Sequence, residues 1–147
     1  MKTSALEEIQ STPRTETLRV LIVEHSKTDV ELLLLQLKGM GIPFDATLAE
    51  DVEQFRSSLK ENDFTIVLSD YRLPNWTAMD ALRELRAAGK DIPFIVVTGT
   101  LGEEAAVECV KQGVSDFVLK ENLARLPGAV QRALNENALR GRKKPGE

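Results

Sequence analysis

The chain has 147 residues, of which 42% are hydrophobic and 29% charged, a composition typical of one soluble domain with a substantial core. Its net charge of -4 argues against a nucleic-acid partner, since phosphate binding needs a basic surface. The single cysteine excludes an intrachain disulfide and a cysteine-rich metal site. We find no apolar run that fits a membrane span or a signal peptide, so we expect a cytoplasmic protein without a membrane partner.

Composition changes along the chain predict three segments. Residues 1–17 are polar and lack a sustained period, which predicts a flexible leader. Residues 140–147 are basic and contain proline and glycine, which predicts a flexible tail. The segment between them, residues 18–139, is expected to be the folded domain.

Five apolar runs alternate with five segments of helical periodicity in this domain. In chain order the runs, which predict buried strands, cover residues 18–23, 44–49, 66–68, 92–97 and 117–119. The helical segments cover residues 26–39, 50–59, 75–89, 103–113 and 127–139. This alternation predicts an α/β fold of flavodoxin-like type, a doubly wound five-stranded parallel sheet in the order 2-1-3-4-5 with helices on both faces.

Three details of these elements stay open at this stage. Ser26 or Thr28 can cap the first helix, and Asn75 or Thr77 can cap the third. Trp76 either anchors an exposed loop or covers the third helix.

Four of the five strands end on a group that can react or bind a ligand: Glu24-His25, Asp70, Thr98 and Lys120. The carboxyl ends of parallel strands meet at one edge of the sheet, and the order 2-1-3-4-5 makes the first strand a neighbour of the third. We therefore expect Glu24 and His25 beside Asp70. A carboxylate nucleophile, metal ligands, a hydroxyl and an ammonium together suit phosphoryl transfer.

Each of these groups taken alone also has an ordinary explanation. Asp70 fits about equally well as a turn cap, and Thr98 as a strand-end hydroxyl bonded to the backbone. Lys120 fits better as a solvated surface lysine, and Glu24-His25 can be a turn pair. Only their joint position at one edge favours a site.

The chain resembles the receiver domains of two-component response regulators in the segments VLIVEHSKTD, VLSDYRLP, PFIVVTGT and GVSDFVLK. The resemblance extends over residues 18–139. It implies that Asp70 is the phosphoacceptor, taking a phosphoryl group from a histidine kinase or phosphotransfer protein, and that Thr98 and Lys120 contact this group. It also implies that Phe117 is a switch residue that turns inward when Thr98 moves.

The resemblance implies a divalent metal site, for Mg²⁺ or Mn²⁺, made by Glu24, residue 25, Asp70 and the backbone carbonyl of Arg72. The family has an acid at both positions after the first strand, and here the second is His25. Mg²⁺ prefers oxygen ligands, so an imidazole is a poor replacement. We expect weakened Mg²⁺ binding with Mn²⁺ relatively favoured. The alternative function is a pseudo-receiver that signals without phosphorylation.

We expect a single-domain switch without enzymatic activity, or the receiver part of a longer protein. Its target protein is expected on the face of the fourth helix, fifth strand and fifth helix, around Val107, Lys111 and Arg125. A haloacid-dehalogenase-type phosphatase fits less well, because it needs a second acid where Arg72 stands. A flavodoxin-like cofactor binder also fits less well, because the segment EHSKTD lacks a glycine to cradle phosphate.

Overall fold

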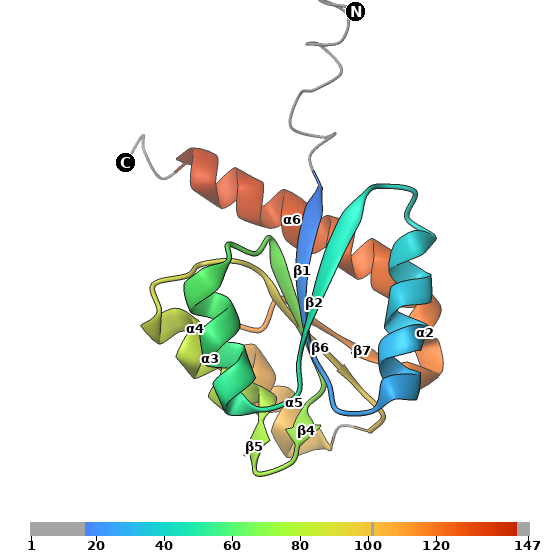
Figure 1. Cartoon of the computed structure of the whole chain (residues 1–147), viewed down its shortest axis with the longest axis vertical. Coiled ribbons are helices and arrows are strands. Elements are labelled where there is room, and N and C mark those ends of the chain that lie inside the picture. The colour runs from blue at the N-terminus through green and yellow to red at the C-terminus, as the bar shows by residue number, and fades with distance from the viewer. Residues whose placement is uncertain (1–16, 101, 144–147) are drawn as a thin grey trace, which may run out of the picture.

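The computed structural model describes residues 17–100 and 102–143, and these form a parallel sheet with helices on both faces (Figure 1). Five strands make up the sheet in the order β2-β1-β3-β6-β7. They are β1 (Leu18–Val23), β2 (Phe44–Ala49), β3 (Ile66–Ser69), β6 (Phe94–Thr98) and β7 (Asp116–Leu119). The predicted fold and strand order are confirmed, since β6 and β7 are the fourth and fifth strands of this sheet.

Helices α2 and α6 cover one face of the sheet, while α3, α4 and α5 cover the other (Figure 1). Their bounds are α2 (Lys27–Lys38), α3 (Val52–Glu61), α4 (Ala78–Ala87), α5 (Glu103–Gln112) and α6 (Leu126–Lys143), with the 3₁₀ helix η2 (Lys120–Arg125) before α6. Side chains of a strand alternate between faces, so Val20 and Ile22 of β1 pack with α2 and α6, while Leu21 and Val23 pack on the opposite side. Burial on both faces explains the nearly continuous apolar sequence of β1.

The cap of α2 is Ser26 and not Thr28. The Ser26 hydroxyl accepts a hydrogen bond of 3.3 Å from the backbone N–H of Asp29, which satisfies a donor that has no partner within the helix. This bond fixes where α2 begins, immediately after the carboxyl end of β1.

A two-stranded hairpin that the sequence analysis did not predict joins β3 to α4. Its strands are β4 (Arg72–Leu73) and β5 (Trp76–Thr77), and each is too short to produce a recognisable period. Asn75 lies in its turn with φ of 72°, in the left-handed region that asparagine tolerates better than most residues. Thr77 therefore caps α4, and its hydroxyl accepts a hydrogen bond from the backbone N–H of Met79.

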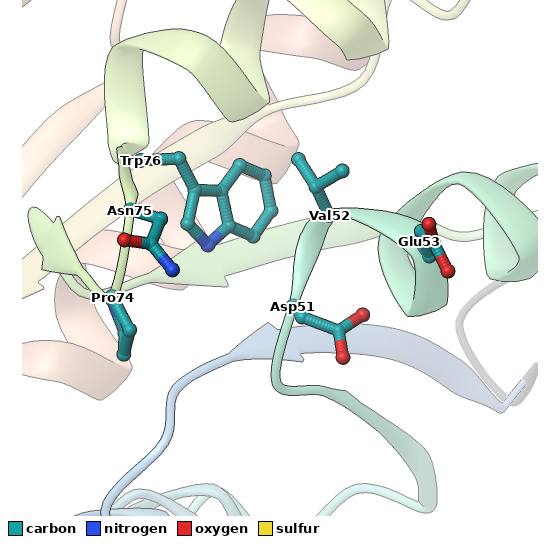
Figure 2. Close-up of a pocket in the computed structure, with 6 residues that line it drawn as sticks. All are labelled: Asp51, Val52, Glu53, Pro74, Asn75 and Trp76. Carbon is teal, nitrogen blue, oxygen red and sulfur yellow. The ribbon is translucent and has the colours of Figure 1, made fainter.

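Trp76 is a core residue and not an exposed loop anchor. Its side chain is buried, and its ring meets that of Phe55 edge-on with the centroids 5.7 Å apart. Figure 2 shows the indole ring facing Val52 across a pocket of about 400 Å³. Among the described residues, its Nε1 lacks a hydrogen-bond partner. The pocket is lined by Asp51, Val52, Glu53, Pro74, Asn75 and Trp76, and thus by none of the residues expected at the phosphorylation site.

Helix α6 runs on to Lys143, so residues 140–143, expected in a loose tail, continue the last helix. Arginine and lysine have high helix propensity, and cations are favourable at a helix C-terminus. Residues 1–16 of the expected leader and residues 144–147 of the expected tail lie outside the described residues, so the flexibility of both segments stays a prediction. In the described ranges, neither α6 nor any other helix combines the length and apolar character that a membrane crossing requires.

Replacing the α2 cap tests the observed start of this helix. We expect Ser26→Ala to lower the free energy of unfolding by about 1 kcal/mol, because the Asp29 N–H loses its acceptor. Thr28→Ala, at the exposed neighbouring candidate, is the matched control and should change stability little. Urea unfolding followed by circular dichroism measures both, and a larger loss for Thr28→Ala would contradict the assignment.

Candidate phosphorylation site

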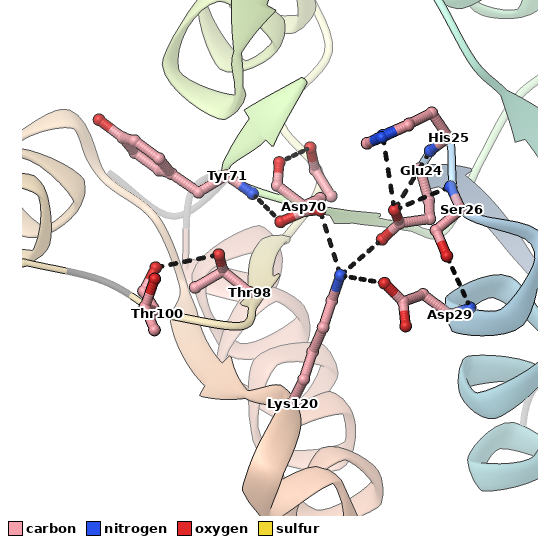
Figure 3. Close-up of polar contacts among 10 residues, drawn as sticks. Glu24, His25, Ser26, Asp29, Asp70, Tyr71, Thr98, Thr100 and Lys120 are labelled. Atoms are coloured by element: carbon pink, nitrogen blue, oxygen red, sulfur yellow. Dashed lines mark hydrogen bonds and ion pairs between the residues drawn. The ribbon is translucent and has the colours of Figure 1, made fainter. Parts of the chain in front are cut away.

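The structure brings Glu24, Asp70, Thr98 and Lys120 to the carboxyl edge of the sheet (Figure 3). They follow or end strands β1, β3, β6 and β7 respectively, as the strand order requires. Hydrogen bonds join Lys120 to Glu24 and Asp70, whereas the Thr98 hydroxyl bonds to the backbone. The role of each residue in phosphoryl transfer stays a prediction.

Lys120 is the centre of this cluster. Its ammonium nitrogen Nζ donates hydrogen bonds to three carboxylates, with distances of 3.1 Å to Glu24 Oε1, 2.6 Å to Asp29 Oδ2 and 3.1 Å to Asp70 Oδ2. The lysine side chain is 19% exposed, so it is not a solvated surface lysine. The Lys120 ammonium therefore links the carboxyl ends of β1 and β3 and the first turn of α2 to the carboxyl end of β7.

Glu24 carries its carboxylate in the interior of the protein, with 1% of the side chain exposed. Its Oε2 accepts hydrogen bonds from the backbone N–H groups of His25 at 3.2 Å and Ser26 at 3.1 Å. Burial, followed by the negative charge of Asp70, raises the pKa of the Glu24 carboxyl above its ordinary value. Burial alone would lower the pKa of Lys120, but the hydrogen bond with Asp29 and the charge of Asp70 outweigh it and raise that pKa.

Asp70 is held by its backbone and by both carboxylate oxygens. Its N–H donates to the carbonyl of Val23 at 2.9 Å, which joins it to the end of β1. Its Oδ1 accepts from the N–H of Tyr71 at 2.7 Å, while Oδ2 accepts from Lys120. The residue is 9% exposed, so its carboxylate is largely buried.

Glu24, His25 and Asp70 each offer one ligand atom, and these atoms lie within 4.8 Å of one another. Two carboxylate oxygens suit a hard divalent cation, whereas the imidazole suits a softer ion. The His25 side chain is 50% exposed, and its Nδ1 lies 3.8 Å from Glu24 Oε2. Arg72 begins β4, two residues after Asp70, and the role of its carbonyl stays a prediction.

Thr98 and Phe117, the expected switch pair, lie on the neighbouring strands β6 and β7. Thr98 is 3% exposed, and its hydroxyl donates to the carbonyl of Thr100 at 3.2 Å. This is the ordinary backbone bond of a strand-end hydroxyl. Phe117 is partly buried and lines two pockets together with Val110 of α5. Its ring therefore lies between the core and the surface of α5.

Two residues that contact the site, Asp29 and Tyr71, were not predicted from the sequence. Asp29 is not among the site residues expected from the sequence, yet it makes the shortest bond to Lys120. Its place in the first turn of α2 puts it near the carboxyl edge of the sheet, but whether its side chain reaches Lys120 depends on the angle at which α2 leaves β1. Tyr71 donates its hydroxyl to Glu108 of α5 at 3.2 Å, and the spacing of these two residues carries no signal for the contact.

A family model described as "Response regulator receiver domain" matches residues 20–131. Among curated relatives, the transcriptional regulatory protein ZraR of Escherichia coli is 27% identical over 120 residues, covering 81% of this chain and 27% of ZraR. The regulatory protein LuxO of Vibrio vulnificus is 38% identical over 99 residues, covering 67% of this chain and 21% of LuxO. The chain thus spans about a quarter of the length of these relatives.

Solved structures give the same family. A response regulator receiver protein from Pseudomonas putida is 32% identical with a TM-score of 0.68, covering 80% of this chain and 98% of that chain. The receiver domain of a sensor histidine kinase from Pseudomonas aeruginosa is 26% identical with a TM-score of 0.69, covering 82% of this chain and 99% of that chain. The latter has a magnesium ion coordinated in its active site cleft.

Removing the central ammonium should make stability strongly dependent on pH. We expect Lys120→Met to lower the free energy of unfolding at pH 8 by about 3 kcal/mol, because three carboxylates lose their common cation. A carboxyl whose folded pKa is raised, as for Glu24, favours folding below its unfolded pKa and loses that contribution as pH rises through its folded pKa. The difference in free energy of unfolding between the variant and wild type should therefore become smaller towards pH 5.

Urea unfolding at several pH values between 5 and 8 measures this difference. Lys27→Met, at an exposed lysine at the start of α2, is the control and should show neither a large loss nor this pH dependence. An equal difference at pH 5 and pH 8 for Lys120→Met would show that the carboxylates are not balanced by Lys120.

Proposed function

Because this chain belongs to the response regulator receiver domain family, we propose that Asp70 accepts a phosphoryl group from a histidine kinase or a phosphotransfer protein of a two-component system. One observation carries this proposal. Lys120 Nζ lies 3.1 Å from Asp70 Oδ2, in a cluster that joins all the carboxyl-edge groups expected for phosphoryl transfer except Thr98. The phosphorylated domain then acts by changing its binding surface for a target protein.

In the proposed reaction a carboxylate oxygen of Asp70 forms a bond to phosphorus. The bond between phosphorus and the donor's imidazole nitrogen breaks at the same time, and its electron pair stays on the imidazole. Lys120 neutralises the phosphoryl oxygens, and the Thr98 hydroxyl exchanges the carbonyl of Thr100 for one of them. The buried position of Asp70 strengthens these interactions, because water screens them less.

A divalent cation would supply further positive charge to the phosphoryl oxygens. Glu24 and Asp70 would hold it, with the carbonyl of Arg72 and the exposed imidazole of His25 as further ligands. The magnesium ion in the Pseudomonas aeruginosa receiver supports a cation at this edge. The imidazole in place of an acid supports a relative preference for Mn²⁺ over Mg²⁺.

The proposed output surface consists of Val107, Lys111 and Arg125 around Phe117. An apolar pocket of about 500 Å³ lies between Phe117 and α5, lined in part by Val107 and Lys111. Val107 is 52% exposed, which supports a protein contact at this place. If Phe117 turns inward as Thr98 moves, the floor of this pocket changes, and the change is available to a partner.

His25 favours a second candidate, a pseudo-receiver that signals without phosphorylation. The two candidates differ in one chemical outcome, the presence of an aspartyl phosphate. A small phosphodonor can test this outcome without the cognate kinase.

Acetyl phosphate should add the mass of one phosphoryl group to the wild-type protein in the presence of Mn²⁺ or Mg²⁺. We expect no added mass for Asp70→Asn, because the amide lacks the nucleophilic oxygen pair of a carboxylate. Asp63→Asn, at an aspartate that is 92% exposed, is the control and should be modified like wild type. Intact-protein mass spectrometry measures the adduct, and its absence from wild type in both metals would support the pseudo-receiver.

Restoring the acid at position 25 tests the metal preference. We expect wild type to bind Mn²⁺ more tightly than Mg²⁺, and His25→Asp to raise Mg²⁺ affinity by about tenfold, because a carboxylate oxygen replaces a softer nitrogen. Isothermal titration calorimetry measures both affinities. If wild type and His25→Asp bound Mg²⁺ with equal affinity, the proposed preference for Mn²⁺ over Mg²⁺ would be contradicted.

A further inference from the structure

We propose that Asp29 is a positioning residue that supplies the negative charge lost at position 25 and retains Lys120 at the site, an inference that rests on the proposed phosphoacceptor function. The family has two acids after the first strand, whereas this chain has Glu24 followed by His25. The expected ligand set therefore lacks one carboxylate. Asp29, five positions after Glu24, brings a third carboxylate to Lys120 from the first turn of α2 (Figure 3).

The contact distances support this assignment. Asp29 Oδ2 lies 2.6 Å from Lys120 Nζ, whereas Glu24 and Asp70 each place an oxygen at 3.1 Å. A short bond between two ionised groups is of the strong, charge-assisted kind. Of the three carboxylates, Asp29 is thus the one that Lys120 approaches most closely.

The local structure fixes Asp29 in this position. Its backbone N–H is bound by the Ser26 cap, so the residue sits at a defined place at the start of a rigid helix. Its side chain is 28% exposed, compared with 1% for Glu24. Partial hydration means that the Asp29 charge costs less to maintain than a fully buried charge would.

The balance of charges gives Asp29 a function. Glu24, Asp29 and Asp70 carry three negative charges and Lys120 one positive charge, so the cluster has a formal charge of -2. This matches a divalent cation. The family's two acids, phosphoacceptor and lysine give the same sum. Without Asp29 the sum here would be -1, because His25 contributes no negative charge.

Asp29 also differs from Glu24 and Asp70 because it is not one of the residues that can surround a cation. Glu24 and Asp70 belong to the group of residues that can surround a cation, and Asp29 does not. When their oxygens turn to a cation, or when Asp70 carries a phosphoryl group, Lys120 loses partners on that side. Asp29 remains bonded to it, so the ammonium stays within reach of the phosphoryl oxygens.

A double-mutant cycle between positions 25 and 29 tests this inference. We expect Asp29→Asn to weaken Mn²⁺ binding by about tenfold in the wild-type background, because one unit of negative charge is removed near the site. In the His25→Asp background the same substitution should weaken binding much less, because the missing acid has been restored. Isothermal titration calorimetry of the four proteins at pH 8 gives the coupling.

Glu31→Gln is the matched control, because this exposed acid lies on the same helix and does not contact Lys120. It makes the same change of charge, so it separates a specific effect of Asp29 from general electrostatics and from the helix dipole. Its Mn²⁺ affinity should stay close to that of wild type.

A metal-free readout follows Lys120 itself. In chelator-treated protein at pH 8, the chemical shift of the Lys120 side-chain ammonium should change in Asp29→Asn relative to wild type, because its closest partner is lost, and Glu31→Gln should leave it unchanged. The inference would be overturned if Asp29→Asn and Glu31→Gln lowered the Mn²⁺ affinity equally. It would also be overturned if Asp29→Asn lowered this affinity by the same factor in the wild-type and His25→Asp backgrounds. An unmodified Asp70 after acetyl phosphate treatment contradicts the proposed function instead, since neither readout here uses a phosphodonor.

Discussion

The bonds from one ammonium group to three carboxylates define the architecture of this site. Lys120 follows the last strand, while its partners follow β1 and β3 or begin α2, so these ion pairs join segments distant in sequence. A carboxylate as buried as that of Glu24 would be costly without a cation beside it. The parallel sheet makes the arrangement possible, because it directs the ends of β1, β3, β6 and β7 to a single edge.

Much of the fold was predictable because its strands are buried on both faces. β1 and β3 have apolar sequences that alternate between two cores, one under α2 and α6 and the other under α3, α4 and α5. Such runs are recognisable without tertiary information, and the helices between them carry caps and terminal glycines. The choice between Ser26 and Thr28 was not predictable, since both hydroxyls can cap and the local geometry decides.

The candidate site also contains residues that were predictable from the sequence and residues that were not. Glu24, Asp70, Thr98 and Lys120 were found because each ends or follows a strand, and strand order then determines which ends are neighbours. Asp29 was missed because a side chain from a helix reaches the edge only through the angle at which α2 leaves β1. The hairpin of β4 and β5 was missed for a different reason, since two-residue strands leave no periodic pattern.

A pair of adjacent acids meets two requirements of a receiver site at once, ligand geometry and net charge. In the proposed site of this chain, different residues would meet the two requirements. Asp29 contributes charge through Lys120 without standing among the residues that can surround a cation, while His25 stands among them without contributing negative charge. On the proposed assignments, His25 would govern ion selectivity, because selectivity depends on the chemistry of the ligand atom. Asp29 would govern the retention of Lys120, because its partly exposed carboxylate lies only 2.6 Å from the ammonium nitrogen. This proposed division of roles would allow a phosphoacceptor site to work without the second acid.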